Sequence, residues 1–156
     1  IVIPQVDTAV ALGRVLDQQF PLCDALIMCA AAADARPVHK SNEKIQKASL
    51  QMIELEPNPD LLATVSKGRK PSQVIVGFAA ETQNQLANAK KKLEEEGLDL
   101  LYVNDVSGGA IFGSDSTSGT ILTSGGQQIT VTQGSKQTLA NVLLDLVEIQ
   151  ISLANV

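Results

Sequence analysis

The chain of 156 residues contains no tryptophan, and aromatic residues make up only 3% of it. This shortage removes most of the side chains on which nucleic-acid bases stack. The net charge of −5 points the same way, because proteins that bind nucleic acid use a broad basic face to displace counterions. We therefore expect no nucleic-acid partner.

Two cysteines and one histidine are too few for a convincing zinc site. Cys29 lies in an apolar run and is more typical of a small buried hydrophobic residue than of a nucleophile. His39 stands alone in a polar stretch, where a loop residue without a ligand is the simpler interpretation. The residues alone leave the metal ligands unknown.

Long apolar runs are also lacking. None approaches the roughly 20 residues that span a membrane, and the first ten residues lack the basic leader of a signal peptide. An apolar fraction of 44% and a mean hydropathy of +0.11 are typical of a globular chain. We expect one cytoplasmic domain over residues 1–156 without a membrane partner. The chain starts inside an expected strand and without Met, which favours a fragment.

Hydrophobic periodicity predicts an alternation of strands and helices. Helices are expected over residues 7–20, 58–67, 81–97 and 135–154, with Asp7 and Asn58 as N-caps of the first two and Gly97 ending the third. Strands are expected over 1–3, 24–32, 49–57, 72–78 and 98–103, and a hairpin over 119–132. This order predicts an α/β, Rossmann-like, doubly wound and mostly parallel sheet with helices on both faces and a C-terminal β-hairpin arm.

Small side chains and positive charge meet after the second expected strand. Ala30–Ala33 leave room for a ligand to lie against the backbone at a strand's carboxyl end, where such sheets bind ligands. Residues 36–47 then carry four Lys or Arg residues against one Glu, a sum of +3; since the total is −5, the rest sums to −8. A positive cluster in an acidic chain suits a small anionic ligand, although a solvated charged loop explains the charge equally well.

The common nucleotide motifs are absent. Neither G-x-G-x-x-G nor G-x-x-x-x-G-K-[ST] occurs, and no G-x-S-x-G marks a serine nucleophile. Phosphate binding is therefore expected from lysines and helix N-termini. Asp34 and Asp60 are candidates to hold a divalent ion or a ribose hydroxyl, with capping of a turn or helix as the alternative for each.

Six segments in order carry a resemblance: "AAAADARP", "EKIQK", "NPDLL", "VGFAAET", "KKKLEEEGLDLLYVNDVS" and "FGSD". Together, over essentially the whole chain, they resemble the bacterial phosphopantothenoylcysteine synthetases of coenzyme A biosynthesis. In that family the synthetase is usually the C-terminal half of a bifunctional protein, after a decarboxylase that uses FMN. The resemblance implies such a fused or partner decarboxylase and a homodimer.

The resemblance also implies a ligase with two half-reactions. The carboxylate of 4′-phosphopantothenate attacks the α-phosphate of CTP to give an acyl-cytidylate and pyrophosphate. The amine of L-cysteine then displaces CMP, and Mg²⁺ accompanies the triphosphate. Three alternatives stay open: the ATP-dependent form of the same ligase, a nucleotide-binding module without chemistry, and a dimerisation domain.

Carried over by position, the resemblance implies one catalytic residue, Lys44, which matches the first lysine of the family's K-x-K-K motif. It also implies that Phe78 packs on the nucleotide and that Lys92 reaches toward it, with core packing and a solvated helix face as their alternatives. The full nucleotide-binding set is Met28, Cys29, Ala30, Asp34, Lys44, Pro59, Asp60, Leu61, Leu62, Phe78 and Lys92.

The chain departs from the family at three points. Gln46 replaces the third residue of K-x-K-K, and Glu96 stands where the family has a second lysine after Lys92, which inverts the charge at an expected phosphate contact. The family's glycine-rich first strand and its N-x-S-S-G segment do not occur in this sequence.

Overall fold

The computed structural model describes residues 4–47, 52–81, 85–105 and 114–154. The strand expected over residues 1–3 lies outside these ranges. So do residues 82–84, near the start of the helix expected over 81–97, and residues 106–113.

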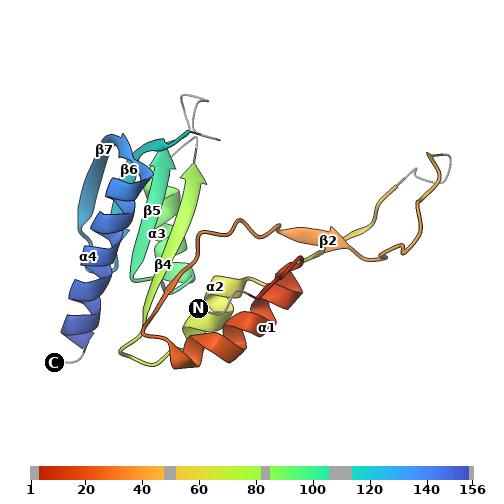
Figure 1. The fold of residues 1–156 in the computed structure, drawn as a ribbon, viewed down its shortest axis with the longest axis horizontal. Coiled ribbons are helices and arrows are strands. Elements are labelled where there is room, and N and C mark those ends of the chain that lie inside the picture. Colours follow the sequence, from red (N-terminus) through yellow and green to blue (C-terminus); the bar gives the residue numbers. More distant parts are fainter. Residues whose placement is uncertain (1–3, 48–51, 82–84, 106–113, 155–156) are drawn as a thin grey trace.

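A five-stranded sheet in the order β1-β4-β5-β6-β7 forms the centre of the body (Figure 1). Its first three strands, β1 (Ala25–Ile27), β4 (Val74–Glu81) and β5 (Leu100–Asp105), are parallel neighbours. The hairpin of β6 (Ser116–Thr123) and β7 (Gln128–Ser135) then joins β5 in antiparallel register. The α/β, Rossmann-like class is confirmed; the sheet is mixed, and the hairpin extends it instead of standing apart as an arm.

Helices cover both faces of the sheet, as expected. On one face lie α1 (Ala9–Gln19), the short 3₁₀ helix η1 (Phe20–Leu22), α2 (Leu61–Lys67) and α3 (Gln85–Glu95), and on the other face lies α4 (Lys136–Ala154). The strands alternate between the two layers: Ile75 packs among α1, α2 and α3, whereas Val76 packs against α4. Both side chains are fully buried, which places β4 in the middle of the molecule.

Several expected boundaries shift. The strand expected over 24–32 ends at Ile27; Met28 N still donates to Val76 O at 2.9 Å, and Ala30–Ala33 then leave the sheet as exposed chain. The N-cap of α1 is Thr8, whose Oγ1 accepts from Ala11 N, and not Asp7. The third helix ends at Glu95, two residues before the expected Gly97, whose φ of +63° is the left-handed conformation that favours glycine just after a helix.

An arm projects from the body between the alanines and α2 (Figure 1). We define it as residues 35–57. At its base β2 (Ala35–Pro37) and β3 (Leu55–Pro57) form a two-stranded antiparallel sheet of their own. The strand expected over 49–57 is thus confirmed only at its last three residues, since residues 52–54 are not in a strand and 48–51 lie outside the described ranges.

The close packing of β6 on β5 depends on Gly119. A Cβ there would lie 2.1 Å from the carbonyl oxygen of Val103 and 3.0 Å from the ring of Tyr102. Tyr102 is 2% exposed, so its ring has no open space into which to move. The absence of a side chain at Gly119 therefore fixes where Tyr102 lies.

We predict that Gly119→Ala lowers the free energy of unfolding by about 1–3 kcal/mol, because overpacking forces backbone and ring apart. Urea unfolding followed by far-UV circular dichroism measures this. Gly125→Ala is the matched control: its Cβ would meet only Thr123 Oγ1 at 3.7 Å, so its unfolding midpoint should stay near that of the parent chain. Equal midpoints for the two variants would contradict the role of Gly119.

Candidate functional site

A cavity of about 520 Å³ opens beside the carboxyl ends of β1 and β4. One wall is Ala30–Ala33, which we call the alanine strip, together with Asp34. The opposite wall is the N-terminal end of α2 with the segment before it. The last turns of α3 complete the cavity. Its lining residues are Met28, Ala30, Ala31, Ala32, Ala33, Asp34, Asn58, Pro59, Asp60, Leu61, Leu62, Phe78, Ala79, Ala80, Lys92 and Glu96.

The structure brings together all the predicted nucleotide-binding residues except Cys29 and Lys44. Met28, Ala30 and Asp34 come from the end of β1 and the chain after it, and Pro59, Asp60, Leu61 and Leu62 come from the start of α2. Phe78 is contributed by β4 and Lys92 by α3. Segments up to about 60 residues apart in the chain thus line one cavity.

Cys29 is exposed, so the expectation that it is a buried hydrophobic residue is wrong. The reason is the early end of β1, after which alternate residues no longer point into a core. Partial desolvation nevertheless raises the pKa of the Cys29 thiol, which makes it a poor nucleophile near neutral pH. Its side chain is not among those that line the cavity.

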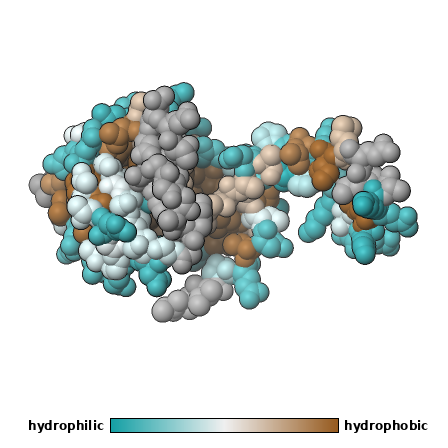
Figure 2. Space-filling model, turned by 90° about the horizontal axis from the view of Figure 1, so that it is seen from above, coloured by the Kyte–Doolittle hydropathy of each residue, from teal (hydrophilic) through white to brown (hydrophobic). Residues whose placement is uncertain are grey.

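Lys44 lies on the arm and not at the cavity of its own chain. It is exposed, as are all the described arm residues from Val38 to Lys47. Figure 2 shows the outer part of the arm as a lobe set off from the body, with hydrophobic residues on its surface. His39 and Lys40 share this exposed segment.

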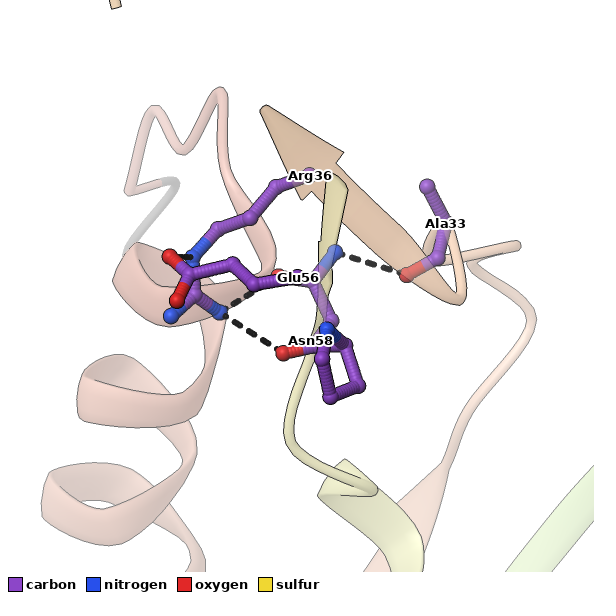
Figure 3. A network of polar contacts seen from close by, with 5 residues as sticks. Ala33, Arg36, Glu56 and Asn58 are labelled. Carbon is purple, nitrogen blue, oxygen red and sulfur yellow. Dashed lines mark hydrogen bonds and ion pairs between the residues drawn. The ribbon is translucent and has the colours of Figure 1, made fainter. Parts of the chain in front are cut away.

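A polar network at the base of the arm ties the two cavity walls together (Figure 3). Asn58 Nδ2 donates to Ala33 O at 2.8 Å, and Asn58 N donates to Asp34 O at 2.8 Å. The guanidinium of Arg36 donates to Asn58 Oδ1 and to Glu56 Oε1, both at 2.9 Å. Asn58 is therefore bonded to the alanine strip on one side and to β2 on the other.

Sequence reasoning missed this network. It assigned Arg36 to the positive cluster and Asn58 to the N-cap of α2, but the helix is capped by Asp60, whose Oδ1 accepts from Ala63 N at 2.9 Å. Asn58 is unavailable as a cap because its side chain is used at the arm. The signal in the sequence was the Glu56 and Asn58 pair facing Arg36, which becomes visible only once β2 and β3 are known to pair.

Phe78 is supported from behind by an aromatic neighbour. Its ring meets Tyr102 edge-to-face, with centroids 5.8 Å apart and planes at 69°. Thr117 Oγ1 donates its proton to Asn104 Oδ1, so at the 2.7 Å contact between the two hydroxyls Tyr102 is the donor. The chain Tyr102–Thr117–Asn104 holds the tyrosine in place, and Phe78, which also lines the cavity, packs with Tyr102 in the layer on the α4 side of the sheet.

Charge at the α3 side of the cavity comes from one ion pair. Lys92 Nζ lies 3.6 Å from Glu96 Oε1. Burial raises the pKa of Glu96, Lys92 opposes that shift, and the nearby carboxylate of Asp60 adds to it. Among the described residues, no three His, Cys, Asp or Glu side chains gather as a metal-binding group.

The sequence model of the family described as "DNA/pantothenate metabolism flavoprotein C-terminal domain" matches residues 1–150. The chain belongs to this family. The resemblance found in the sequence is thereby confirmed.

The "Coenzyme A biosynthesis bifunctional protein CoaBC" of Mycobacterium tuberculosis is 38% identical over 153 residues, which cover 91% of this chain and 37% of that protein. The chain thus spans little more than a third of the length of such relatives. The protein of the same name from Haemophilus influenzae is 44% identical over 90 residues, 57% of this chain and 22% of that protein.

Solved structures agree with the fold. The crystal structure of the C-terminal domain of a coenzyme A biosynthesis bifunctional protein CoaBC superposes with a TM-score of 0.76 at 27% identity, covering 98% of this chain and 66% of that one. A Cab2 mutant in complex with phosphopantothenate-cysteine gives a TM-score of 0.59 at 15% identity, over 82% and 45% of the two chains. At that identity the likeness concerns the fold alone.

We predict that Asn58→Ala loosens the cavity walls. Losing about 1 kcal/mol of hydrogen bonding raises local opening about fivefold, seen as faster amide exchange at residue 58 and at Val38, which bonds Glu54 O across the arm. Hydrogen exchange by NMR measures this. Asn42→Ala, on the exposed part of the arm, is the control and should leave both amides unchanged. Unchanged exchange in Asn58→Ala would show that the network does not hold the walls.

Proposed function

We propose that this chain is the synthetase domain, over residues 1–156, of a CTP-dependent phosphopantothenate–cysteine ligase in coenzyme A biosynthesis. The observation that carries the proposal is the cavity itself: nine residues implied by the family resemblance, from four separate segments, line one space of about 520 Å³. That volume is in the usual range for sites that hold small molecules.

The cavity supplies surfaces for each part of a nucleotide. Leu61 and Leu62 offer an apolar surface for a flat base, Phe78 lines the same cavity, and the alanine strip allows close approach to the backbone. Asp34 is exposed at the mouth of the cavity, where its carboxylate suits a ribose hydroxyl or a divalent ion.

The proposed reaction converts a poor acyl donor into a good one. A carboxylate oxygen of 4′-phosphopantothenate attacks the α-phosphorus of CTP, the P–O bond to the β-phosphate breaks, and pyrophosphate leaves. The amine of L-cysteine then attacks the acyl carbon and loses a proton, and CMP leaves with the C–O bond electrons. The protein's part is to hold the reactants in line and to neutralise the phosphates.

Mg²⁺ fits this site in part. Asp34 and Asp60 both line the cavity, but one oxygen of Asp60 already accepts the capping bond from Ala63. Asp34, together with phosphate oxygens, is therefore the better candidate to hold the ion, which would offset charge on the triphosphate. FMN would belong to a fused decarboxylase domain and has no role in this cavity.

Turnover with each nucleotide tests the proposal. The full-length protein is incubated with 4′-phosphopantothenate, L-cysteine, Mg²⁺ and either CTP or ATP, and pyrophosphate release is measured. CTP should support turnover at least tenfold better than ATP at equal concentration. A preference for ATP would assign the ATP-dependent form of the ligase, and binding without turnover would favour the non-catalytic nucleotide module.

The arm supports a homodimer as the active form. In the described part of the arm, five large hydrophobic residues are exposed in the single chain, with Met52 86% exposed; the set is Val38, Ile45, Met52, Ile53 and Leu55. Exposed apolar surface of this extent on a short projection suits a protein partner. We propose that a second copy covers it and that Lys44 thereby reaches the cavity of that copy, which keeps Lys44 as the catalytic residue.

Mixing two inactive variants tests the dimer and the placement of Lys44 together. Lys44→Gln and Asp34→Asn each remove one part of the site and should be inactive alone. Co-expressed, they should restore about a quarter of the parent activity, because half of the dimers are mixed and each mixed dimer has one intact site.

The matched control is Lys40→Gln, which changes a neighbouring arm lysine to which no contact is assigned and should keep full activity. No recovery on mixing would mean that Lys44 acts within its own chain or not at all. Sedimentation of the parent protein as a monomer at micromolar concentration would contradict the dimer directly.

A further inference from the structure

One buried polar atom of a residue that lines the cavity has no partner. Among the side chains in the described part of the chain that are not exposed, Glu96 Oε2 is the buried oxygen or nitrogen that makes no hydrogen bond. The other oxygen of the same carboxylate faces Lys92. The Glu96 side chain is only 14% exposed, so water reaches it poorly, although the residue lines the cavity. A buried acceptor without a donor is costly and becomes satisfied if a ligand supplies the donor.

The chain holds this carboxylate in place. Glu96 N donates to Lys92 O at 3.0 Å, which continues the last turn of α3. Gly97 follows with its left-handed φ, and Ser66 Oγ of α2 donates to Gly97 O at 3.1 Å. Glu96 is thus fixed between two packed helices, and its position does not depend on a mobile loop.

The charges around Glu96 indicate which part of a nucleotide lies there. Asp60 is close enough to raise the pKa of Glu96, and Lys92 is the cation that faces both the cavity and Glu96. With two carboxylates and one ammonium group, this end of the cavity is not a favourable place for a triphosphate. It suits the neutral end of the nucleotide, and the apolar residues Leu61 and Leu62, which line the same cavity, suit a flat base.

A carboxylate can only accept hydrogen bonds when ionised. Opposite a base edge it therefore favours an exocyclic amino group and disfavours a carbonyl oxygen, whose lone pairs would face its own. Cytosine and adenine carry such an amino group at the position where uracil and hypoxanthine carry a carbonyl. This contrast holds for either ring size, so it does not depend on whether the site takes a pyrimidine or a purine.

We propose that Glu96 is a specificity-determining residue that accepts a hydrogen bond from the exocyclic amino group of the bound nucleobase. The inference rests on the proposed function, since it requires a nucleoside triphosphate in this cavity. It also gives the charge inversion at this position a role: the residue that weakens the site for phosphate selects the base. Lys92 balances the charge of Glu96 while the site is empty.

Two nucleotide pairs that differ at this one substituent test the proposal. Calorimetry at pH 8 with Mg²⁺ on the full-length protein measures the Kd values of CTP against UTP, and of ATP against ITP. If the cavity binds pyrimidine nucleotides, CTP should bind at least about tenfold more tightly than UTP. If it binds purine nucleotides, the same should hold for ATP over ITP. Glu96→Gln should bring that ratio close to one, because the amide can turn and donate to a carbonyl.

Glu95→Gln is the matched control, since Glu95 is the adjacent carboxylate, is exposed and pairs with Lys91. It should keep the parent ratio. A thermal melt of each variant checks folding.

The outcomes separate the two proposals. If Glu96→Gln changes the affinity for both members of a pair equally, Glu96 acts only through Lys92 and the base assignment is overturned while the proposed function stands. Equal binding of amino and carbonyl forms by the parent protein overturns it in the same way. If none of the four nucleotides binds, the proposed function fails and this inference fails with it.

Discussion

The requirement that β4 be buried on both faces determines the layout of the molecule. Its side chains alternate between two apolar layers, one formed with α1, α2 and α3 and the other with α4, and three of its residues are almost completely inaccessible. A strand in this position has parallel neighbours on either side, so its carboxyl end meets that of β1 at one edge. The cavity opens where these apolar layers end, and the small residues there leave it unfilled.

The arm is held by polar contacts and not by burial. It has no core of its own, and its described outer residues are exposed, so polar contacts hold its base to the body. The ion pair between Arg36 and Glu56 is more than a third exposed on both sides and adds little stability by itself. The ion pair instead orients the arm: together with Asn58, it sets the direction in which the chain leaves the body.

Local patterns in the sequence predicted most of the elements. Four helices, the buried strands β4 and β5 and the turn of the hairpin followed from periodicity and glycine placement. The end of β1 did not, because alanines read as an apolar run while burying too little surface to hold a strand in a sheet. The cap of α2 moved to Asp60 because Asn58 is engaged by residues that lie more than 20 positions away. Such long-range bonds leave no local signal.

The candidate site likewise contains residues that could be placed from the sequence and residues that could not. Cavity residues next to strand ends could be placed from topology, since the carboxyl ends of parallel strands converge. The position of Lys44 could not, because an exposed arm is oriented by contacts outside its own segment. The sequence shows Glu96 as a departure from the family, but only the structure shows that one of its carboxylate oxygens has no hydrogen-bond partner.

The alanine strip has a consequence for how this protein responds to selection. Ala30–Ala33 are exposed and line a partly apolar cavity, so a larger hydrophobic side chain there would bury new apolar surface inside it. Such a replacement would make the chain more heat-resistant while filling the space a ligand needs. If the proposed ligand occupies this space, a library screened for thermostability alone would therefore accumulate inactive variants at these four positions.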